Sequence, residues 1–224
     1  MSDGARQTIA VLGGAGHEGA GLAARWAKAG HSVVIGSRDP GRAAAAAQDI
    51  AARTGGTVTG TSNKEAAAQG EVVVIAVPYS AQQALAQEVA AQLAGKILID
   101  VTVPLVPPKV SRVQLPESGS AVVALQALLG DEVRVVSAFQ NVSAHQLADL
   151  DGEVDCDVLV CGDDEAARET VCQLAANIGV TAWHAGPLAN SAASEALTSV
   201  LIFINRRYKV AEGAGIRLTK AARP

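Results

Sequence analysis

The stretch that decides the fold is IAVLGGAGHEG, residues 9–19. Its apolar start predicts a buried β-strand, and the glycines that follow break this strand before a segment with helical spacing. Three of these glycines stand at the spacing G-x-G-x-x-G: Gly14, Gly16 and Gly19. At a strand-to-helix turn, such glycines allow a tight turn, close approach of a pyrophosphate and close packing of the helix. The stretch therefore predicts a dinucleotide site.

The whole turn is expected to contact the phosphates, because the N-terminus of the following helix offers free N–H groups and a positive dipole. The residues expected to line it are Gly14, Ala15, Gly16, His17, Glu18 and Gly19.

Short β-branched runs and helical segments alternate along the rest of the chain. The expected strands are 8–12, 31–35, 58–60, 72–77, 96–101, 134–138, 157–161 and 181–185. The expected helices are 19–29, 42–53, 63–69, 80–93, 121–129, 165–178 and 191–207. The continuous apolar run 72–77 is typical of a parallel strand buried on both faces. This pattern predicts an α/β fold of the Rossmann type with a doubly wound, mainly parallel sheet. We expect a dinucleotide-binding domain over residues 1–150 and a small C-terminal α/β extension over residues 151–224 that completes the substrate cleft.

Composition limits the kind of partner. The 224 residues are 49% hydrophobic but only 3% aromatic, and the net charge of -4 gives no broad basic surface for nucleic acid or anionic lipid. Cys156, Cys161 and Cys172 lack the spacing of a zinc site, so no metal is expected. No apolar run approaches the roughly 18 residues that span a bilayer, and no signal peptide opens the chain. We expect a cytoplasmic protein whose partners are small molecules, with no nucleic acid or membrane partner.

The end of the second expected strand indicates which dinucleotide is bound. An NAD site usually has an acid there for the ribose 2′-OH, whereas this chain reads Gly36-Ser37-Arg38. Arg38 can pair with a 2′-phosphate, Ser37 can donate a hydroxyl, and Arg42 lies four residues on along a helix. Asp39 is the nearest acid, and it can instead cap that helix. The residues therefore favour NADP(H).

Six segments together resemble one family, the coenzyme F420-dependent NADP oxidoreductases. They are residues 9–38 through the glycine turn, AVPYSA (76–81), VVSAFQNVSA (135–144), DVLVCGDD (157–164), AGPLANS (185–191) and GIRL (215–218). The resemblance covers nearly the whole chain, and the two segments VCGDD and GPLANS are much more specific than the glycine turn.

The resemblance implies hydride exchange between C4 of nicotinamide and C5 of the deazaflavin coenzyme F420, with the two rings stacked. Such a transfer needs no acid or base residue, so no catalytic residue is expected. By resemblance, the nicotinamide ribose is bordered by Val77, Pro78 and Tyr79, and the nicotinamide ring by Val142 and Ala144. The deazaflavin pocket is implied to include Gly186, Pro187, Leu188, Asn190 and Ser191.

Some positions depart from the family and leave alternatives open. Gln140 and Asn141 replace a His-Thr pair of archaeal members, and His145 or Tyr79 could supply a proton. An NADPH-dependent reductase of an imine, carbonyl or pterin is therefore one alternative, and a non-catalytic NADP(H)-sensing protein is another. The basic run 206–209 either meets a phosphorylated or polyglutamylated substrate tail or is a set of exposed helix-end cations. The apolar last helix leads us to expect a homodimer.

Overall fold

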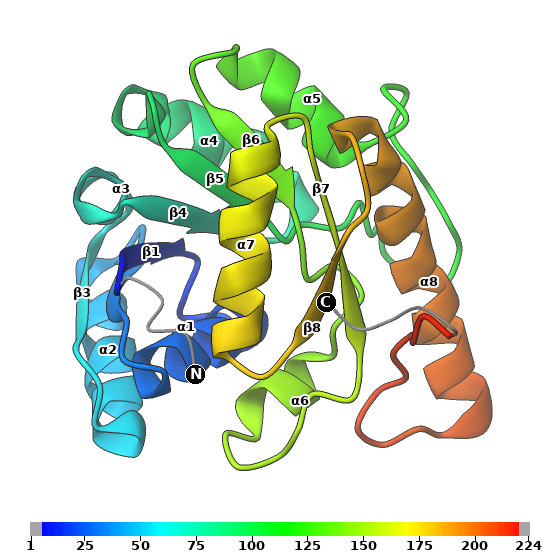
Figure 1. Cartoon of the computed structure of the whole chain (residues 1–224), viewed down its shortest axis with the longest axis horizontal. Helices are drawn as coiled ribbons and strands as arrows, with labels where there is room; N and C mark the ends of the chain where they lie inside the picture. Colours follow the sequence, from blue (N-terminus) through cyan, green and yellow to red (C-terminus); the bar gives the residue numbers. More distant parts are fainter. Residues whose placement is uncertain (1–5, 220–224) are drawn as a thin grey trace.

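One eight-stranded sheet runs through the computed structural model, which describes residues 6–219 (Figure 1). The strands lie in the order β3-β2-β1-β4-β5-β6-β7-β8. Their bounds are β1 Thr8–Leu12, β2 Ser32–Ser37, β3 Val58–Ser62, β4 Val72–Ile75, β5 Ile97–Asp100, β6 Arg134–Ser137, β7 Asp157–Gly162 and β8 Thr181–His184. The α/β fold with a mainly parallel sheet is confirmed.

The strand order reverses at β1, which lies between β2 and β4. Val11 pairs with Ile35 on one side and with Val74 on the other, and all three strands are parallel. In an open α/β sheet, the crevice at the carboxyl ends of strands around such a reversal is where ligands bind. The glycine turn that follows β1 therefore lies at the centre of the expected site.

The sheet continues past residue 150 but changes direction. β7 runs antiparallel to β6, with Ser137 opposite Cys161, and β8 is parallel to β7. The two expected domains thus share one sheet, and the boundary near residue 150 stays a prediction. Residues 1–5 and 220–224 of these domains lie outside the described residues.

Within residues 6–219, eight α-helices connect or flank the strands. They are α1 His17–Lys28, α2 Pro40–Thr54, α3 Asn63–Gln69, α4 Tyr79–Leu93, α5 Ala121–Leu129, α6 Ala144–Ala148, α7 Glu165–Asn177 and α8 Ser191–Tyr208, with one 3-10 turn at Leu188–Asn190. Helix α6 was not expected, because five residues are too few to show a helical apolar period. Strand β4 ends at Ile75 and not at Val77, because Pro78 has no N–H to donate and instead caps α4.

Two apolar layers cover the sheet. Helices α1, α2 and α7 pack on one face, and α3, α4 and α5 on the other. Trp26 of α1 is fully buried in the first layer, where its indole N–H donates to the carbonyl of Leu174 (3.0 Å) and its ring meets Phe139 edge-on at 6.0 Å. This layer holds α1, and hence the glycine turn, firmly on the sheet.

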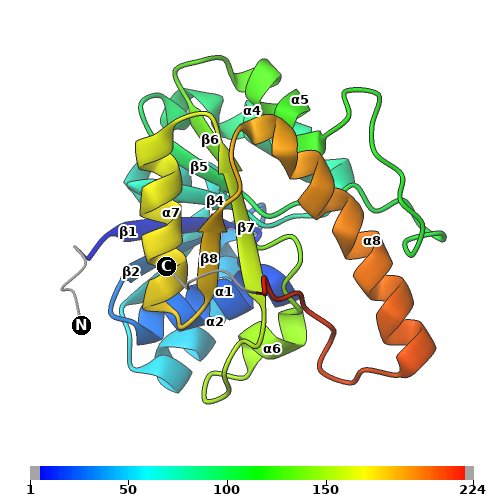
Figure 2. The same ribbon diagram turned by 45° about the vertical axis from the view of Figure 1, so that its right-hand side comes forward.

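Helix α8 lies outside these layers. Figure 2 shows it running along the outer side of the molecule beside the long loop before α5, to which Ser199 donates a hydrogen bond at the carbonyl of Arg112 (3.4 Å). Its outer face leaves Val200 and Phe203 exposed by 45% and 57%. Within residues 6–219, no helix combines the length and apolarity needed to cross a membrane.

Candidate active site

The glycine turn is closed by contacts that no larger residue could make. Gly13 has a positive φ of 82°, and a Cβ there would lie 2.5 Å from the carbonyl oxygen of Ala76. Its N–H donates to the carbonyl of Gly36 (3.0 Å), which ties the turn to the end of β2. The motif spacing singled out Gly14, but Gly13 is the position whose positive φ requires a glycine.

Helix α1 begins directly after the glycine turn and has no side-chain N-cap. Gly16 occupies the N-cap of α1 and has no side chain to accept from the first-turn N–H groups. Free N–H groups at the positive end of a helix dipole are of the kind that can bind a diphosphate, and binding at this helix stays a prediction. The other two motif glycines serve packing: a Cβ on Gly14 would lie 2.9 Å from the Val11 carbonyl, and one on Gly19 would lie 2.9 Å from the Gly13 carbonyl.

A cavity of about 330 Å³ opens beside the turn. Seven of the expected cofactor residues line it: Ala15, Gly16, Ser37, Arg38, Arg42, Val77 and Pro78. The other seven do not: Gly14, His17, Glu18, Gly19, Tyr79, Val142 and Ala144. His17 is exposed on α1, Tyr79 opens α4, and Val142 and Ala144 follow β6 further along the sheet. The structure thus joins the turn to the predicted 2′-phosphate site in one cavity.

Two exposed arginines mark the β2 end of this cavity. Neither Arg38 nor Arg42 forms an ion pair within the described part of the chain. The Asp39 carboxylate caps α2, where it accepts from the N–H groups of Gly41 (2.9 Å) and Arg42 (3.3 Å). Its charge is therefore engaged at the helix N-terminus, and both guanidinium groups are free to bind a phosphate.

Asn63 also lines the cavity, although the sequence did not single it out. It begins α3, is only 3% exposed, and its Oδ1 finds no hydrogen-bond partner among residues 6–219. A buried polar atom without a partner costs stability unless a ligand or water satisfies it. The only feature of the sequence that could have pointed to Asn63 is its position directly after a strand, next to the N-cap residue Ser62.

Two carboxyl groups at the carboxyl ends of the strands have raised pKa values, and sequence spacing gave no sign of either. Asp100 ends β5 and is fully buried, and its carboxylate accepts from the N–H of Thr102 (2.7 Å) and from Nε2 of Gln82. Burial raises the pKa of Asp100 to about 6. Burial also raises the pKa of Glu18, on the first turn of α1, to about 8, and the charge of Asp100 contributes.

The segment after β6 is anchored by its amides. Nε2 of Gln140 donates to the Asp100 carbonyl (2.8 Å), and Nδ2 of Asn141 donates to the Asp157 carbonyl (2.8 Å). Both side chains and Val142 border a second cavity of about 190 Å³, whose far side is formed by α8. His145 follows on α6 and is exposed.

The predicted deazaflavin segment forms the turn into α8. Leu188 and Ser191 are buried, and the Ser191 hydroxyl lies 2.7 Å from that of Ser137 at the end of β6. Pro187 and Asn190 are exposed. Contact of this turn with a deazaflavin stays a prediction, as does a role for the basic run 206–209, which is exposed at the end of α8.

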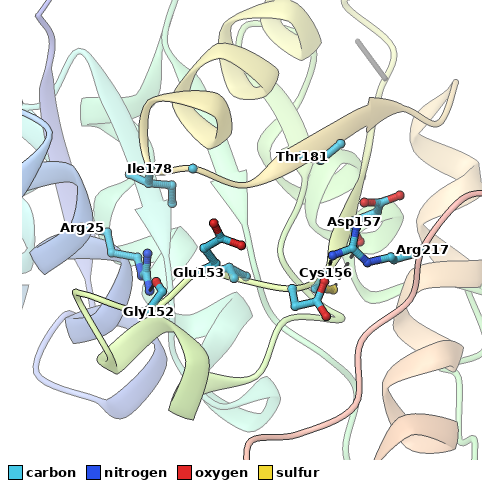
Figure 3. Close-up of a pocket in the computed structure, with 11 residues that line it drawn as sticks. Arg25, Gly152, Glu153, Cys156, Asp157, Ile178, Thr181 and Arg217 are labelled. Atoms are coloured by element: carbon cyan, nitrogen blue, oxygen red, sulfur yellow. Dashed lines mark hydrogen bonds and ion pairs between the residues drawn. The ribbon is translucent and has the colours of Figure 1, made fainter. Parts of the chain in front are cut away.

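A third cavity, of about 370 Å³, lies away from the glycine turn (Figure 3). Arg25 borders it from the last turns of α1, Glu153 points into it, and Asp155 pairs with Arg217. Acidic side chains in its lining disfavour phosphate. Among residues 6–219, no three His, Cys, Asp or Glu side chains are grouped to hold a metal ion.

Known proteins share this fold and much of this sequence. The family described as NADP oxidoreductase, coenzyme F420-dependent, matches residues 8–104. The F420-dependent NADP reductase of Methanocaldococcus jannaschii is 42% identical over 220 residues, covering 94% of this chain and 97% of the relative.

Solved structures agree. One from Arthrobacter sp. FB24, described as a candidate F420-dependent NADP reductase, is 28% identical, covers 95% of this chain and 100% of its own, and superposes with a TM-score of 0.79. An imine reductase from Bacillus cereus is 18% identical, with a TM-score of 0.64 over 91% of this chain and 63% of its own, and so shares the fold alone. The sequence resemblance is confirmed: the chain belongs to the coenzyme F420-dependent NADP oxidoreductase family.

Proposed function

We propose that this chain transfers a hydride between NADP(H) and coenzyme F420. The observation that carries the proposal is one cavity that combines an uncapped helix N-terminus with two arginines free of acidic partners, in a chain of this family. An imine, carbonyl or pterin reductase and a cofactor sensor are the alternatives, and no specific contact in the site favours either.

The protein's part in the reaction is to bind and orient. The two coenzymes, when bound, supply the hydride chemistry themselves. N–H groups of the first turn of α1 hold the diphosphate, and Arg38 and Arg42 hold the 2′-phosphate. Asn63 offers its unpartnered Oδ1 to a donor on the adenosine half. Holding two reactants in attack geometry contributes roughly 7 to 11 kcal/mol, which is why no acid or base residue is needed.

We assign the deazaflavin to the space between the segment after β6 and α8. Val142 borders this space, and the Thr198 hydroxyl of α8 donates to the Gln140 carbonyl (2.7 Å), so α8 and the nicotinamide segment are held together. Pro187 and Asn190 lie at the start of the same helix. In this proposal, residues 151–224 complete the substrate cleft.

Mixing the enzyme with NADPH and oxidised coenzyme F420 tests the function. The visible absorbance of oxidised F420 should disappear at a rate proportional to enzyme concentration, and a parallel reaction with NADH should be much slower. Turnover at background while NADPH still binds would contradict the proposal, and so would faster reduction of an imine, carbonyl or pterin in the same assay.

We also propose a homodimer formed through α8. Val200 and Phe203 expose an apolar face, and Val113 on the neighbouring loop is 42% exposed. A second copy would bury these side chains. Light scattering should give twice the chain mass, and Phe203→Glu should give a monomer. A monomeric unmodified protein would contradict this.

We propose a cytoplasmic location because the thiol groups of this chain are free. Cys156, Cys161 and Cys172 are all free, as is usual in a reducing compartment. Fractionation of cells that express the tagged chain should place it with cytoplasmic marker proteins, and recovery in a secreted or membrane fraction would contradict the proposal.

A further inference from the structure

Positive side chains gather where the loop between β5 and α5 meets the end of α8. Nη1 of Arg206 donates to the Ser111 hydroxyl (3.4 Å), and Lys109 and Arg112 lie on either side of Ser111 in one turn, which the N–H of Arg112 closes on the carbonyl of Lys109 (3.0 Å). Lys109, Arg112 and Arg206 form what we call the cation cluster. All three are exposed, and none forms an ion pair within residues 6–219. In a chain whose net charge is -4, such a cluster is a local attraction for an anion.

The cation cluster lies next to the cavity of about 190 Å³ that α8 forms with the segment after β6. Ile202 and Asn205 line this cavity from one face of α8, and Arg206 follows Ile202 by one helical turn. Ser199, seven residues before Arg206, donates to the carbonyl of Arg112 (3.4 Å). The loop therefore runs along the side of α8 adjoining its cavity face, where Figure 2 shows it.

The C-terminal segment borders the same cavity. The Asn205 carbonyl oxygen Oδ1 accepts from the N–H of Ala214 (2.6 Å), and Nε2 of Gln146 donates to the carbonyl of Gly213 (2.9 Å), so residues 213–214 are held between α8 and α6. The loop between β5 and α5, all of which the structure describes, contributes no residue to the cavity lining. A chain attached to a ring in the cavity can therefore leave it past the loop, where the cation cluster lies.

We propose that the cation cluster binds the anionic tail of the deazaflavin coenzyme while the ring system occupies the cavity. Phosphate and carboxylate groups are the natural partners of guanidinium and ammonium groups. Several exposed cations bind a flexible anionic chain through attraction that salt weakens. The inference rests on the proposed function and on the proposed place of the deazaflavin. It gives the cluster a part in choosing the coenzyme and none in the hydride step.

Comparison of two deazaflavins tests this without turnover. Calorimetric titration measures the Kd of oxidised coenzyme F420, and of the same deazaflavin nucleoside without phosphate or glutamate groups, for enzyme saturated with NADP⁺. We expect the Kd of the coenzyme to be about threefold to a hundredfold lower, as three exposed ion pairs imply. Raising the salt from about 50 mM to about 500 mM should reduce this advantage to less than about threefold, because the Debye length falls to about 4 Å.

Replacement of the cations identifies the site. The triple variant Lys109→Ala, Arg112→Ala, Arg206→Ala should lose the advantage of the tail and keep the Kd of the nucleoside. Arg207→Ala is the matched control, because this exposed arginine stands next to Arg206 but lies over the ring of Tyr208 at 5.8 Å. It should keep the ratio of the two Kd values.

Three results would overturn the inference: equal Kd values for the two deazaflavins in the unmodified enzyme, an advantage of the tail that survives in the triple variant, or an equal loss in Arg207→Ala. A different result would contradict the proposed function itself. In that case neither deazaflavin binds, although NADP⁺ does.

Discussion

Replacing Arg25 with Met tests how the fold holds the segment that follows β6. Arg25 as a whole is only 8% exposed, and its guanidinium group donates to four carbonyl groups at the end of α6 and in the loop after it. These acceptors belong to Gln146 (2.8 Å), Leu147 (3.0 Å), Asp149 and Gly152 (3.0 Å). Figure 3 shows Arg25 beside Gly152. Methionine keeps the apolar stem and removes every donor.

The size of the loss follows from the four acceptors. Each buried carbonyl left without a donor costs about 1 to 3 kcal/mol, and water can reach those on the loop more easily than those on the helix. We therefore expect Arg25→Met to lower the free energy of unfolding by roughly 3 to 5 kcal/mol, a large part of the stability of a typical domain. Urea unfolding at neutral pH measures this as a lower midpoint with an unchanged m-value.

Lys28 supplies the matched control on the same helix. Its amino group reaches the same loop, at the Leu150 carbonyl (2.8 Å) and the Asp151 carboxylate (2.8 Å), but its side chain is 47% exposed. Lys28→Met should cost no more than about 1 kcal/mol, because water screens an exposed pair. Equal losses in the two variants would refute the reasoning that burial makes the Arg25 contacts important.

Three further predictions concern the cofactor site. In fluorescence titration, Arg38→Ala should weaken NADPH binding by about tenfold to a hundredfold, because a charge-assisted hydrogen bond is lost, and should leave NADH binding nearly unchanged. Equal losses of affinity for NADPH and NADH would argue against a contact between Arg38 and the 2′-phosphate. Asn63→Ala should weaken both dinucleotides alike, by up to about tenfold, and unchanged affinities would show that its Oδ1 binds neither. Without ligand, the free energy of unfolding should fall as pH rises toward about 8, because the unfolded chain loses the protons of Asp100 and Glu18 at lower pH than the folded chain does. Glu18→Gln should remove the part of this fall nearest pH 8. An equally steep fall in the variant would contradict the raised pKa of Glu18.

Local patterns predicted much of the fold and half of the cofactor cavity. Strand β1 and helices α3 and α5 have the predicted bounds, and most other elements differ by one or two residues at an end. Ser37 and Arg38 were identified because an acid or a base at the end of the second strand of this motif has one geometric meaning. Helix α6 was missed because a single turn carries no period.

The sequence by itself determined the class of fold, the glycine turn and the choice of NADP(H), because each depends on residues within one strand-turn-helix unit. Only the tertiary structure decided which distant groups meet. Arg25 donates to a carbonyl 122 residues away, Asn63 lines the cavity from the start of α3, and Gln140 donates to the carbonyl of Asp100 because β6 lies beside β5 in the sheet. These contacts depend on strand order and helix packing, which the spacing of neighbouring residues does not predict.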